Sequence, residues 1–572
     1  MSVVRRISIG ALLPAATLTS LFATTATAPS PAAERRPEID PARSADPCQN
    51  SWATAPTLKR DVDRLMDFWS KPNGSTRAQR ASKRLGRPEP VADKPKSKPS
   101  QDRPNVIVFM VDDMRADEMN GPWMRQTRDL IQSQGATFTN SFSPLPLCGP
   151  ARASFFTGKY AHNTGIRTNM TPSSAFNRLD DGHAMPVWLK NAGYNTAFLG
   201  KYINGYAPRS ANKPGSYVPP GWDNWYASID AGTYNYRRTI LSNNGKGTIN
   251  LGGKYQTTEY GKMGSNLVSK LAKKKQPFFF NLSFTAPHTG TPVEADDPRF
   301  KTPVRLPKMR GAYDDLITTP GGVPGEPCND DQPKAVSDKK PIKPGKQRDI
   351  TEVRRQRAES LASVDDAVAR VMRSLRKSGE LDNTYVVFTS DNGYFLGEFR
   401  QPIGKKLQYE PSLRTPTIMR GPGIDEGIKR ERAFTTIDFA PTVADMAGAK
   451  TNTNVDGISL LDVATGEDKP WRRPIVTDAG SHKNTSRYGF GLRTKGLFYG
   501  EYADRHTSRE LFDLERDPRE LRNVAGKPRY RKTARTMADL LDRFRNCSGE
   551  QCQKPSDVQP PSHGSDADGG GT

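Results

Sequence analysis

"NVIVFMV" at residues 105–111 is a continuous apolar run that ends directly in Asp112 and Asp113. Similar short runs, rich in β-branched and aromatic residues, follow as NTAFLG (195–200), PFFFNLSF (277–284), TYVVFTS (384–390) and PTIMR (416–420). Helical patterns lie between these runs. Apolar strands that alternate with helices predict an α/β fold, in which a large, mainly parallel sheet is flanked by helices.

The clearest helix is predicted over 349–377, where apolar residues recur at three- and four-residue spacing and Gly379 follows. We expect this helix to cover the core of the sheet. Residues 303–347 are dense in Pro, Gly and Lys. That composition predicts a long insertion on the surface.

Beyond about residue 447 the pattern changes to short strands, with a hairpin or meander over 488–502 and a closing helix over 533–545. These features predict a smaller C-terminal α+β domain. The full domain prediction is a signal peptide over 1–28, an extension over 29–103, a main domain over 104–446, a small domain over 447–546 and a disordered tail over 547–572.

Composition limits the class of protein. The chain has 572 residues, of which 34% are hydrophobic, and a mean hydropathy of −0.72, which excludes a multi-span membrane protein. Lys and Arg (85) outnumber Asp and Glu (62) by 23, a surplus that attracts polyanions of any chemistry. Because no nucleic-acid-binding motif accompanies this charge, we expect no nucleic-acid partner.

The N-terminus has the pattern of an export signal. Arg5-Arg6 precede an apolar run over 7–22, and the small-x-small pattern Ala26-Thr27-Ala28 follows. This order is typical of a secretory signal peptide that is cleaved near Ala28. Ser, Pro and Thr residues interrupt the run, whereas a membrane span needs about 20 predominantly apolar residues. We therefore expect a secreted or extracytoplasmic protein with no stable membrane anchor.

Polar side chains stand directly after the predicted strands. Since the carboxyl ends of parallel strands meet at one edge of a sheet, we expect a site there, formed by Asp112, Asp113, Lys201, His288, Asp391 and Asn392. Three carboxylates and an amide oxygen suit a hard divalent cation, Ca²⁺ or Mg²⁺, rather than zinc. Each pair alone is also typical of a turn that ends a strand. Their occurrence at two strand ends favours the cation site.

The stretch PLCGPARASFFTGKYAHNTGI at 146–166 is the strongest local feature. Pro150 can begin a helix, which would place Cys148 just before the helix N-terminus and Arg152 one turn along. Such a position is electropositive and favours an anion. The alternative is that Cys148 pairs with another cysteine, although the chain has an odd number, five.

These residues carry a family resemblance. Cys148-Gly149-Pro150-Ala151-Arg152, followed by Thr157-Gly158, resembles the sulfatase motif Cys-x-Pro-x-Arg-x4-Thr-Gly, in which the cysteine is converted to formylglycine. The phrases GKYINGY and SDNGYFLGEF are similar to the branch of N-acetylglucosamine-6-sulfatase and the heparan-sulfate 6-O-endosulfatases. The resemblance implies an alkaline-phosphatase-like fold and a sulfuric ester hydrolase acting on sulfated carbohydrate or aryl sulfate, with 6-O-sulfated N-acetylglucosamine or a related glycosaminoglycan-type sugar as substrate.

The resemblance also implies roles for individual residues. Cys148, modified by a formylglycine-generating enzyme, would be the nucleophile and Arg152 would orient it. Lys201, His288 and Lys405 would hold the sulfate, and a cation, Ca²⁺ or else Mg²⁺, would be held by Asp112, Asp113, Asp391 and Asn392. Many sulfatases carry His where this chain has Ile203. We expect Asn204 and His162 to bind substrate, and Asn204, His162 or His288 to take over part of the work of that His.

If Cys148 is modified, an even set of four cysteines remains. The implied pairing is Cys547 with Cys552, and then Cys48 with Cys328. Two other functions stay open at this point. One is an arylsulfatase, or a phosphonate monoester or phosphodiester hydrolase, on the same fold. The other is a non-catalytic protein that binds polyanions.

Overall fold

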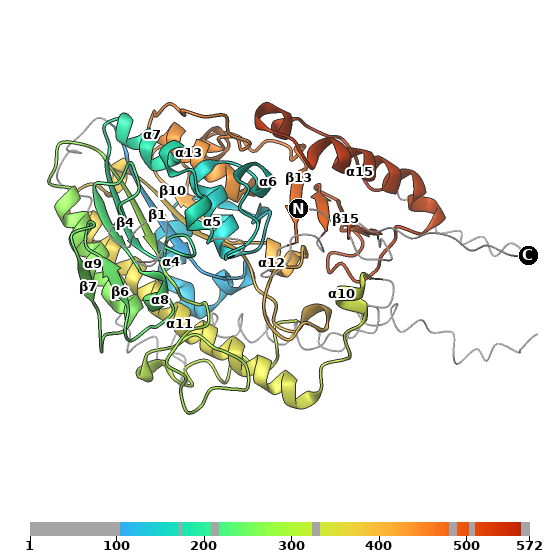
Figure 1. The fold of residues 1–572 in the computed structure, drawn as a ribbon, viewed down its shortest axis with the longest axis horizontal. Coiled ribbons are helices and arrows are strands. Elements are labelled where there is room, and N and C mark those ends of the chain that lie inside the picture. Colours follow the sequence, from blue (N-terminus) through green and yellow to red (C-terminus); the bar gives the residue numbers. More distant parts are fainter. Residues whose placement is uncertain are drawn as a thin grey trace, which may run out of the picture.

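A central sheet of eight strands organises the main domain of the computed structural model (Figure 1). Its order is β11-β2-β10-β9-β1-β8-β4-β5. The bounds are β1 Asn105–Val111, β2 Ala136–Phe138, β4 Asn195–Gly200, β5 Asn224–Ala227, β8 Phe278–Ser283, β9 Thr384–Ser390, β10 Thr417–Arg420 and β11 Ile428–Arg430. In this sheet β10 is antiparallel to its neighbours β9 and β2, and the other pairings are parallel. The predicted mainly parallel sheet is confirmed.

The structure describes residues 103–170, 174–206, 217–322, 332–479, 489–502 and 509–561. The predicted signal peptide, almost all of the N-terminal extension, and the pairing of Cys48 with Cys328 lie outside these residues. No helix within the described ranges is long and apolar enough to cross a membrane.

Helices cover both faces of the sheet, as its apolar strands require. Alternate residues of β1 point to opposite faces, so Ile107 and Phe109 pack under one helix layer and Val106 and Val108 under the other. The first layer is α9 (Gln256–Leu271) with α11 (Pro344–Lys377), and the second is α5 (Cys148–Thr157), α7 (Met185–Asn191) and α13 (Phe439–Met446) (Figure 1). The helix predicted over 349–377 is therefore confirmed, with an earlier start at Pro344.

Part of the expected surface insertion over 303–347 packs into the core. Val304, Met309, Tyr313 and Ile317 are buried in the same core as α11. The segment's Pro, Gly and Lys content concealed these spaced apolar positions. The first turn of α11, which begins with Pro344 at a position where a missing N–H costs nothing, also falls within the range.

The smaller C-terminal domain contains an antiparallel sheet in the order β13-β14-β15-β16. The strands are β13 Ile475–Asp478, β14 Phe490–Arg493, β15 Leu497–Glu501 and β16 Arg509–Asp513. Helix α15 (Arg531–Phe544) packs on this sheet through Met537, Leu540 and Leu541. The predicted hairpin and closing helix are confirmed.

The predicted disordered tail starts too early. Cys547 and Cys552 form a disulfide and are buried, with a 3-10 helix over Gly549–Gln553. Gly549 N donates to Asp456 Oδ1 at 2.8 Å, and Asn163 Nδ2 donates to Cys547 O at 2.8 Å. These bonds join the disulfide segment to Asn163 of the main domain and to Asp456 of the small domain.

Replacing both Cys547 and Cys552 with serine is expected to lower the free energy of unfolding by about 2 kcal/mol, because the cross-link restricts a short loop of the unfolded chain. The measurement is the midpoint of thermal unfolding by circular dichroism, which should fall by a few degrees. An unchanged midpoint would show that the hydrogen bonds of this segment hold it without the cross-link.

Candidate active site

The carboxyl ends of four neighbouring parallel strands bring the predicted residues together. Asp112 and Asp113 follow β1, which lies between β9 and β8, and β4 pairs with the far side of β8. Asp391 follows β9, Lys201 follows β4 and His288 lies on the loop after β8. The topology therefore places these residues at one edge, as the sequence predicts.

Helix α5 brings Cys148 to this edge. The helix begins at Cys148, so the residue is its first and does not precede it. Cys148 is buried, and its Sγ lies 3.3 Å from Asp112 Oδ1 and 2.7 Å from Lys405 Nζ. Gly149 N donates to Asn169 Oδ1 at 2.9 Å, which fixes the first turn. Cys148 is the free cysteine of the described residues.

We call the group of Asp112, Asp113, Cys148, Lys201, His288, Asp391, Asn392 and Lys405 the cluster. Each of its three carboxylates pairs with a buried cationic side chain. Lys201 Nζ contacts Asp112 and Lys405 Nζ contacts Asp113. Arg152 Nε lies 2.8 Å from Asp391 Oδ2. A buried charge without a partner would cost free energy of folding. Each of these charges is therefore balanced by a neighbour of opposite sign.

A second set of contacts fixes the backbone that carries the carboxylates. Asp113 N donates to Asp391 Oδ1 at 3.1 Å, and Asn392 Nδ2 donates to Asp113 Oδ1 at 2.7 Å. Asp113 has φ of 70°, in the left-handed region that few residues other than glycine adopt. Strain of this kind persists only where surrounding contacts over-determine the conformation, as they do here.

The electrostatics of the cluster follow from burial and these pairs. Burial opposes ionisation of Asp112, yet Lys201 and the other nearby cations outweigh it and hold its pKa well below the ordinary range. Burial, with the charge of Asp112, raises the pKa of Asp391 to about 6. Burial opposes the charge on Lys201 and Lys405, but the aspartates outweigh it and raise both pKa values.

The Cys148 thiol has the opposite tendency. Burial and then the charge of Asp112 raise its pKa to about 12. An unmodified thiol is therefore protonated at neutral pH. As a thiol it is a poor nucleophile, because the thiolate is the reactive form.

The carboxylate and amide oxygens at this edge fit a hard cation, and a thiol and an imidazole lie among them. Ligand atoms of Asp112, Asp113, Cys148 and His288 lie within 4.8 Å of one another. Asn392 Oδ1 is buried and accepts no hydrogen bond from any described residue. A buried acceptor without a donor, beside three carboxylates, is the environment that an oxygen-ligated divalent cation satisfies.

Arg152 and His288 have well-defined partners. Arg152 Nη1 donates to Lys201 O and to Ser283 Oγ, both at 2.6 Å, which locks α5 onto β4 and β8. His288 Nδ1 lies 2.7 Å from Thr289 O. A carbonyl only accepts, so Nδ1 carries the hydrogen and Nε2, 3.7 Å from Asp113 Oδ2, has the lone pair in the neutral ring.

Three residues of the site were not predicted. Asn169 holds the first turn of α5, Tyr234 lies against Lys201 and His288, and Arg357 Nη2 donates to Asp113 O at 2.5 Å. Arg357 lies on the apolar face of α11, four residues before Leu361, and is fully buried in ion pairs with Glu118. A charged residue on an apolar helix face was the available signal for Arg357.

The predicted substrate-binding role of His162 is not supported by its location. His162 Nε2 lies 2.9 Å from Cys547 O and its ring stacks on Tyr160, so it contacts the C-terminal disulfide segment. Asn204, by contrast, lies near the cluster, since its Nδ2 donates to the Tyr234 hydroxyl at 2.9 Å. His162 follows α5 in the chain, and its sequence proximity to Cys148 was misleading.

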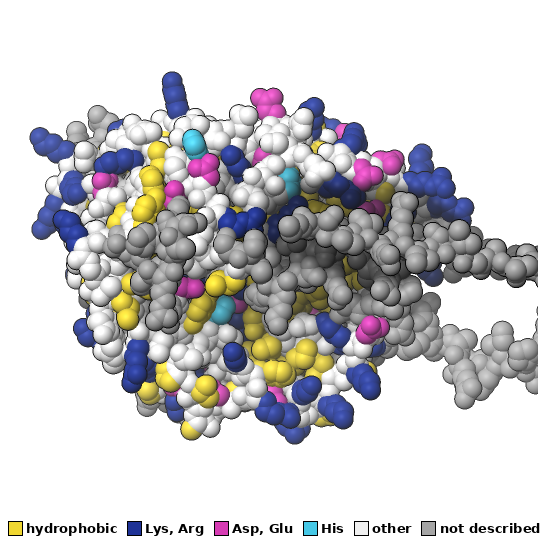
Figure 2. All heavy atoms as spheres, in the orientation of Figure 1, with side chains coloured by type: hydrophobic (Ala, Val, Ile, Leu, Met, Phe, Trp, Pro, Cys, Tyr) yellow, Lys and Arg dark blue, Asp and Glu magenta, His cyan; other side chains and the backbone are white. Residues whose placement is uncertain are grey.

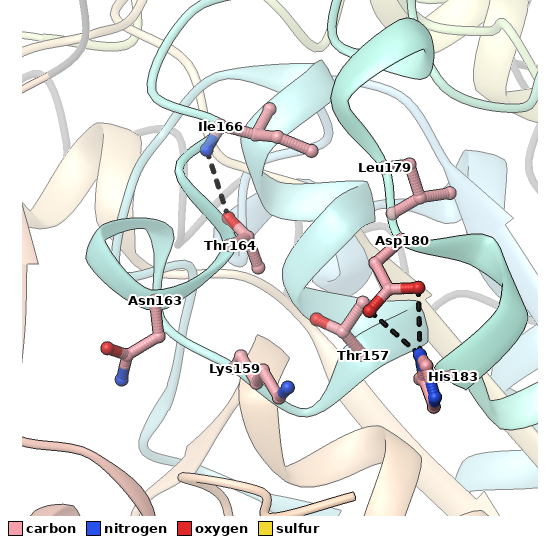
Figure 3. A pocket seen from close by; sticks show the side chains of 8 residues that line it. All are labelled: Thr157, Lys159, Asn163, Thr164, Ile166, Leu179, Asp180 and His183. Carbon is pink, nitrogen blue, oxygen red and sulfur yellow. Dashed lines mark hydrogen bonds and ion pairs between the residues drawn. The ribbon is translucent and has the colours of Figure 1, made fainter.

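A separate pocket opens at the other end of α5 (Figure 3). It is lined by Thr157, Lys159, Asn163, Thr164, Ile166, Leu179, Asp180 and His183. The Asp180 carboxylate faces His183 Nδ1 (Figure 3), and Asp180 Oδ1 lies 2.9 Å from that nitrogen. Because Thr157 ends the helix that Cys148 begins, about 15 Å of helix separates this pocket from the cluster.

Comparison with known proteins identifies the family. A family model described as Sulfatase matches residues 104–449, more than half of the chain. The chain belongs to the sulfatase family. It is therefore a sulfuric ester hydrolase. A second model, described as the C-terminal part of N-sulphoglucosamine sulphohydrolase, matches residues 397–547.

Individual sulfatases are similar to this one over most of its length. N-acetylglucosamine-6-sulfatase of Capra hircus is 29% identical over 80% of this chain and 86% of its own length. An extracellular sulfatase SULF-1 homologue of Drosophila melanogaster is 31% identical over 74% of this chain, which spans only 36% of that relative. A structure solved with its substrate D-glucosamine-2-N,6-O-disulfate has a TM-score of 0.62 and 23% identity, covering 81% of this chain and all of the other. The sulfatase has the alkaline-phosphatase-like fold expected from the sequence.

Proposed function

We propose that this sulfatase is an exported enzyme that hydrolyses the 6-O-sulfate of N-acetylglucosamine or a related glycosaminoglycan-type sugar. The observation that carries the proposal is the burial of Cys148 Sγ between Asp112 Oδ1 and Lys405 Nζ, at the edge where the other predicted residues converge. The similarity to N-acetylglucosamine-6-sulfatase supports the choice of sugar. Lys and Arg side chains around the edge of the face in Figure 2 suit an anionic substrate.

Two groups complete the proposed site. Formylglycine at position 148, made by a formylglycine-generating enzyme, supplies in its hydrated form one hydroxyl that attacks sulfur and a second that later expels sulfate as the aldehyde re-forms. A divalent cation, which we propose to be Ca²⁺, would when bound polarise a sulfate oxygen and favour the ionised hydroxyl. Asp112, Asp113, Asp391 and Asn392 would hold the cation.

The protein's own residues orient and stabilise the reacting groups. Sγ of Cys148 stands where one oxygen of the hydrate would lie, so Lys405, 2.7 Å away, can donate to that oxygen or to the sulfate. Lys201, whose pKa is raised, carries a charge that stabilises negative charge on the sulfate oxygens. Arg152 orients the first turn of α5 through Asp391 and Ser283.

His288 is suited to move the proton. Burial lowers its pKa, and the contact with Thr289 O leaves the lone pair on Nε2 facing the cluster. Nε2 can take the proton of the attacking hydroxyl and return it to the sugar oxygen as the sulfur–oxygen ester bond breaks. The new bond forms between sulfur and the residue at position 148, and the sugar leaves as an alcohol.

The test is release of sulfate by protein coexpressed with a formylglycine-generating enzyme. We expect N-acetylglucosamine 6-sulfate to be cleaved, with a higher kcat/KM than 4-nitrophenyl sulfate and than 4-nitrophenyl phenylphosphonate. Activity confined to aryl sulfates would identify an arylsulfatase, and preference for the phosphonate ester would identify a phosphonate hydrolase. Binding of sulfated sugars without turnover of any ester would favour the polyanion-binding alternative.

A further inference from the structure

Tyr234 contacts two of the residues to which we assign sulfate chemistry. Lys201 Nζ lies 4.9 Å from the centre of the Tyr234 ring. The ring centres of Tyr234 and His288 are 4.6 Å apart, with an angle of 38° between the planes. Lys201 and His288 belong to loops after different strands, and the Tyr234 ring contacts both of them.

The Tyr234 ring is itself held in place. Its hydroxyl accepts a hydrogen bond from Asn204 Nδ2 at 2.9 Å, and Thr291 N donates to Tyr234 O at 2.8 Å. The neighbouring Tyr236 hydroxyl donates to His288 O at 2.7 Å. The loop with Tyr234 and the loop with His288 are therefore joined by hydrogen bonds on both sides of the ring contact.

Ile203 and Asn204, which follow Lys201, have different surroundings. Ile203, where many sulfatases carry His, is 2% exposed and packs in the core with Phe176 and Tyr202. The next residue, Asn204, is 6% exposed and bonds to Tyr234. Asn204 therefore contacts Tyr234, whose ring lies against Lys201 and His288.

We propose that Tyr234 is a positioning residue. It holds the Lys201 ammonium and the His288 ring in the positions that they need when the leaving group departs. The inference rests on the proposed function. An ammonium over an aromatic face is attracted by the negative ring face, and ring contacts between aromatic groups favour a defined geometry. Loss of the ring releases both groups, and small displacements of catalytic groups reduce rates strongly.

The test compares Tyr234→Phe with Tyr234→Leu on a series of substituted phenyl sulfates. Tyr234→Phe keeps the ring, and its kcat/KM is expected to stay within about threefold of wild type. Tyr234→Leu is expected to lose about 10- to 100-fold on poor leaving groups. It should lose less on 4-nitrophenyl sulfate, because an acidic leaving group needs less help. The dependence of rate on leaving-group acidity therefore becomes steeper in the Leu variant.

Tyr194→Leu is the matched control, since Tyr194 also has a cation against its ring, Arg103, and a bonded hydroxyl, but it directly precedes β4, at the edge of the sheet opposite the cluster. This variant is expected to keep the wild-type dependence on leaving-group acidity. An equal loss on every phenyl sulfate in Tyr234→Leu would overturn the proposal, as would a loss in Tyr234→Phe as large as in Tyr234→Leu. Failure of wild type on N-acetylglucosamine 6-sulfate would refute the proposed substrate alone, because the phenyl sulfates still report on Tyr234.

Discussion

Replacing Cys148 with alanine is expected to lower kcat for sulfate esters by at least about 10⁴-fold, because the residue supplies the attacking atom in the proposed reaction. The fold is expected to persist. Cys148 Sγ lies among charged groups, so its removal opens no large apolar cavity. The measurements are kcat on N-acetylglucosamine 6-sulfate and 4-nitrophenyl sulfate, and the midpoint of thermal unfolding.

Two controls separate chemistry from folding. The double variant with serine at Cys547 and Cys552 removes the other cysteines of the described residues and should retain turnover at a temperature below its unfolding midpoint. Mass spectrometry of the peptide ending at Arg152 should show that Cys148 has lost sulfur and gained an aldehyde oxygen. Full activity in Cys148→Ala, or in a wild-type protein whose Cys148 is an ordinary thiol, would contradict the covalent reaction.

The position of the site was predictable because it depends on topology. Asp112 and Asp391 follow apolar strands, and parallel strands in one sheet necessarily present their carboxyl ends together. Cys148 and Arg152 were predictable for a local reason, since one helical turn separates them. Lys405 was accessible only through the family resemblance, because it lies on a loop with no periodic pattern, and the resemblance did not predict its ion pair with Asp113.

Other features depend on contacts that the sequence does not reveal. Tyr234 lies after a short helix, and nothing in its neighbourhood signals that it meets Lys201 and His288. The contact of His162 with Cys547 could not be predicted, because the two residues are remote in the chain. The buried residues around Val304 were missed because average composition obscured them. In each case a long-range packing partner decides the role of the residue.

Replacing Asp391 with asparagine is expected to raise the free Ca²⁺ concentration needed for half-maximal activity by about 10- to 100-fold, because the affinity of an oxygen site depends on its carboxylate charges. Asparagine has nearly the same shape and can still accept from Asp113 N, but its Nδ2 cannot accept from Arg152 Nε, so the ion pair with Arg152 is lost together with the charge. The measurement is kcat against free Ca²⁺ after dialysis with EDTA. Dialysed wild type should be inactive and should recover on addition of Ca²⁺.

Asp438→Asn provides the matched control for Asp391→Asn. Asp438 is as buried as Asp391 and is ion-paired with a buried arginine, Arg473, at 2.5 Å, but it lies outside the cluster. Breaking that pair is expected to cost on the order of 3–5 kcal/mol of stability while leaving the Ca²⁺ dependence unchanged. If both variants shift the Ca²⁺ requirement equally, the shift reports on folding, and if dialysed wild type remains fully active, no cation is required. A shift confined to Asp391→Asn therefore assigns the carboxylate to the cation, because burial and pairing with arginine are common to both residues.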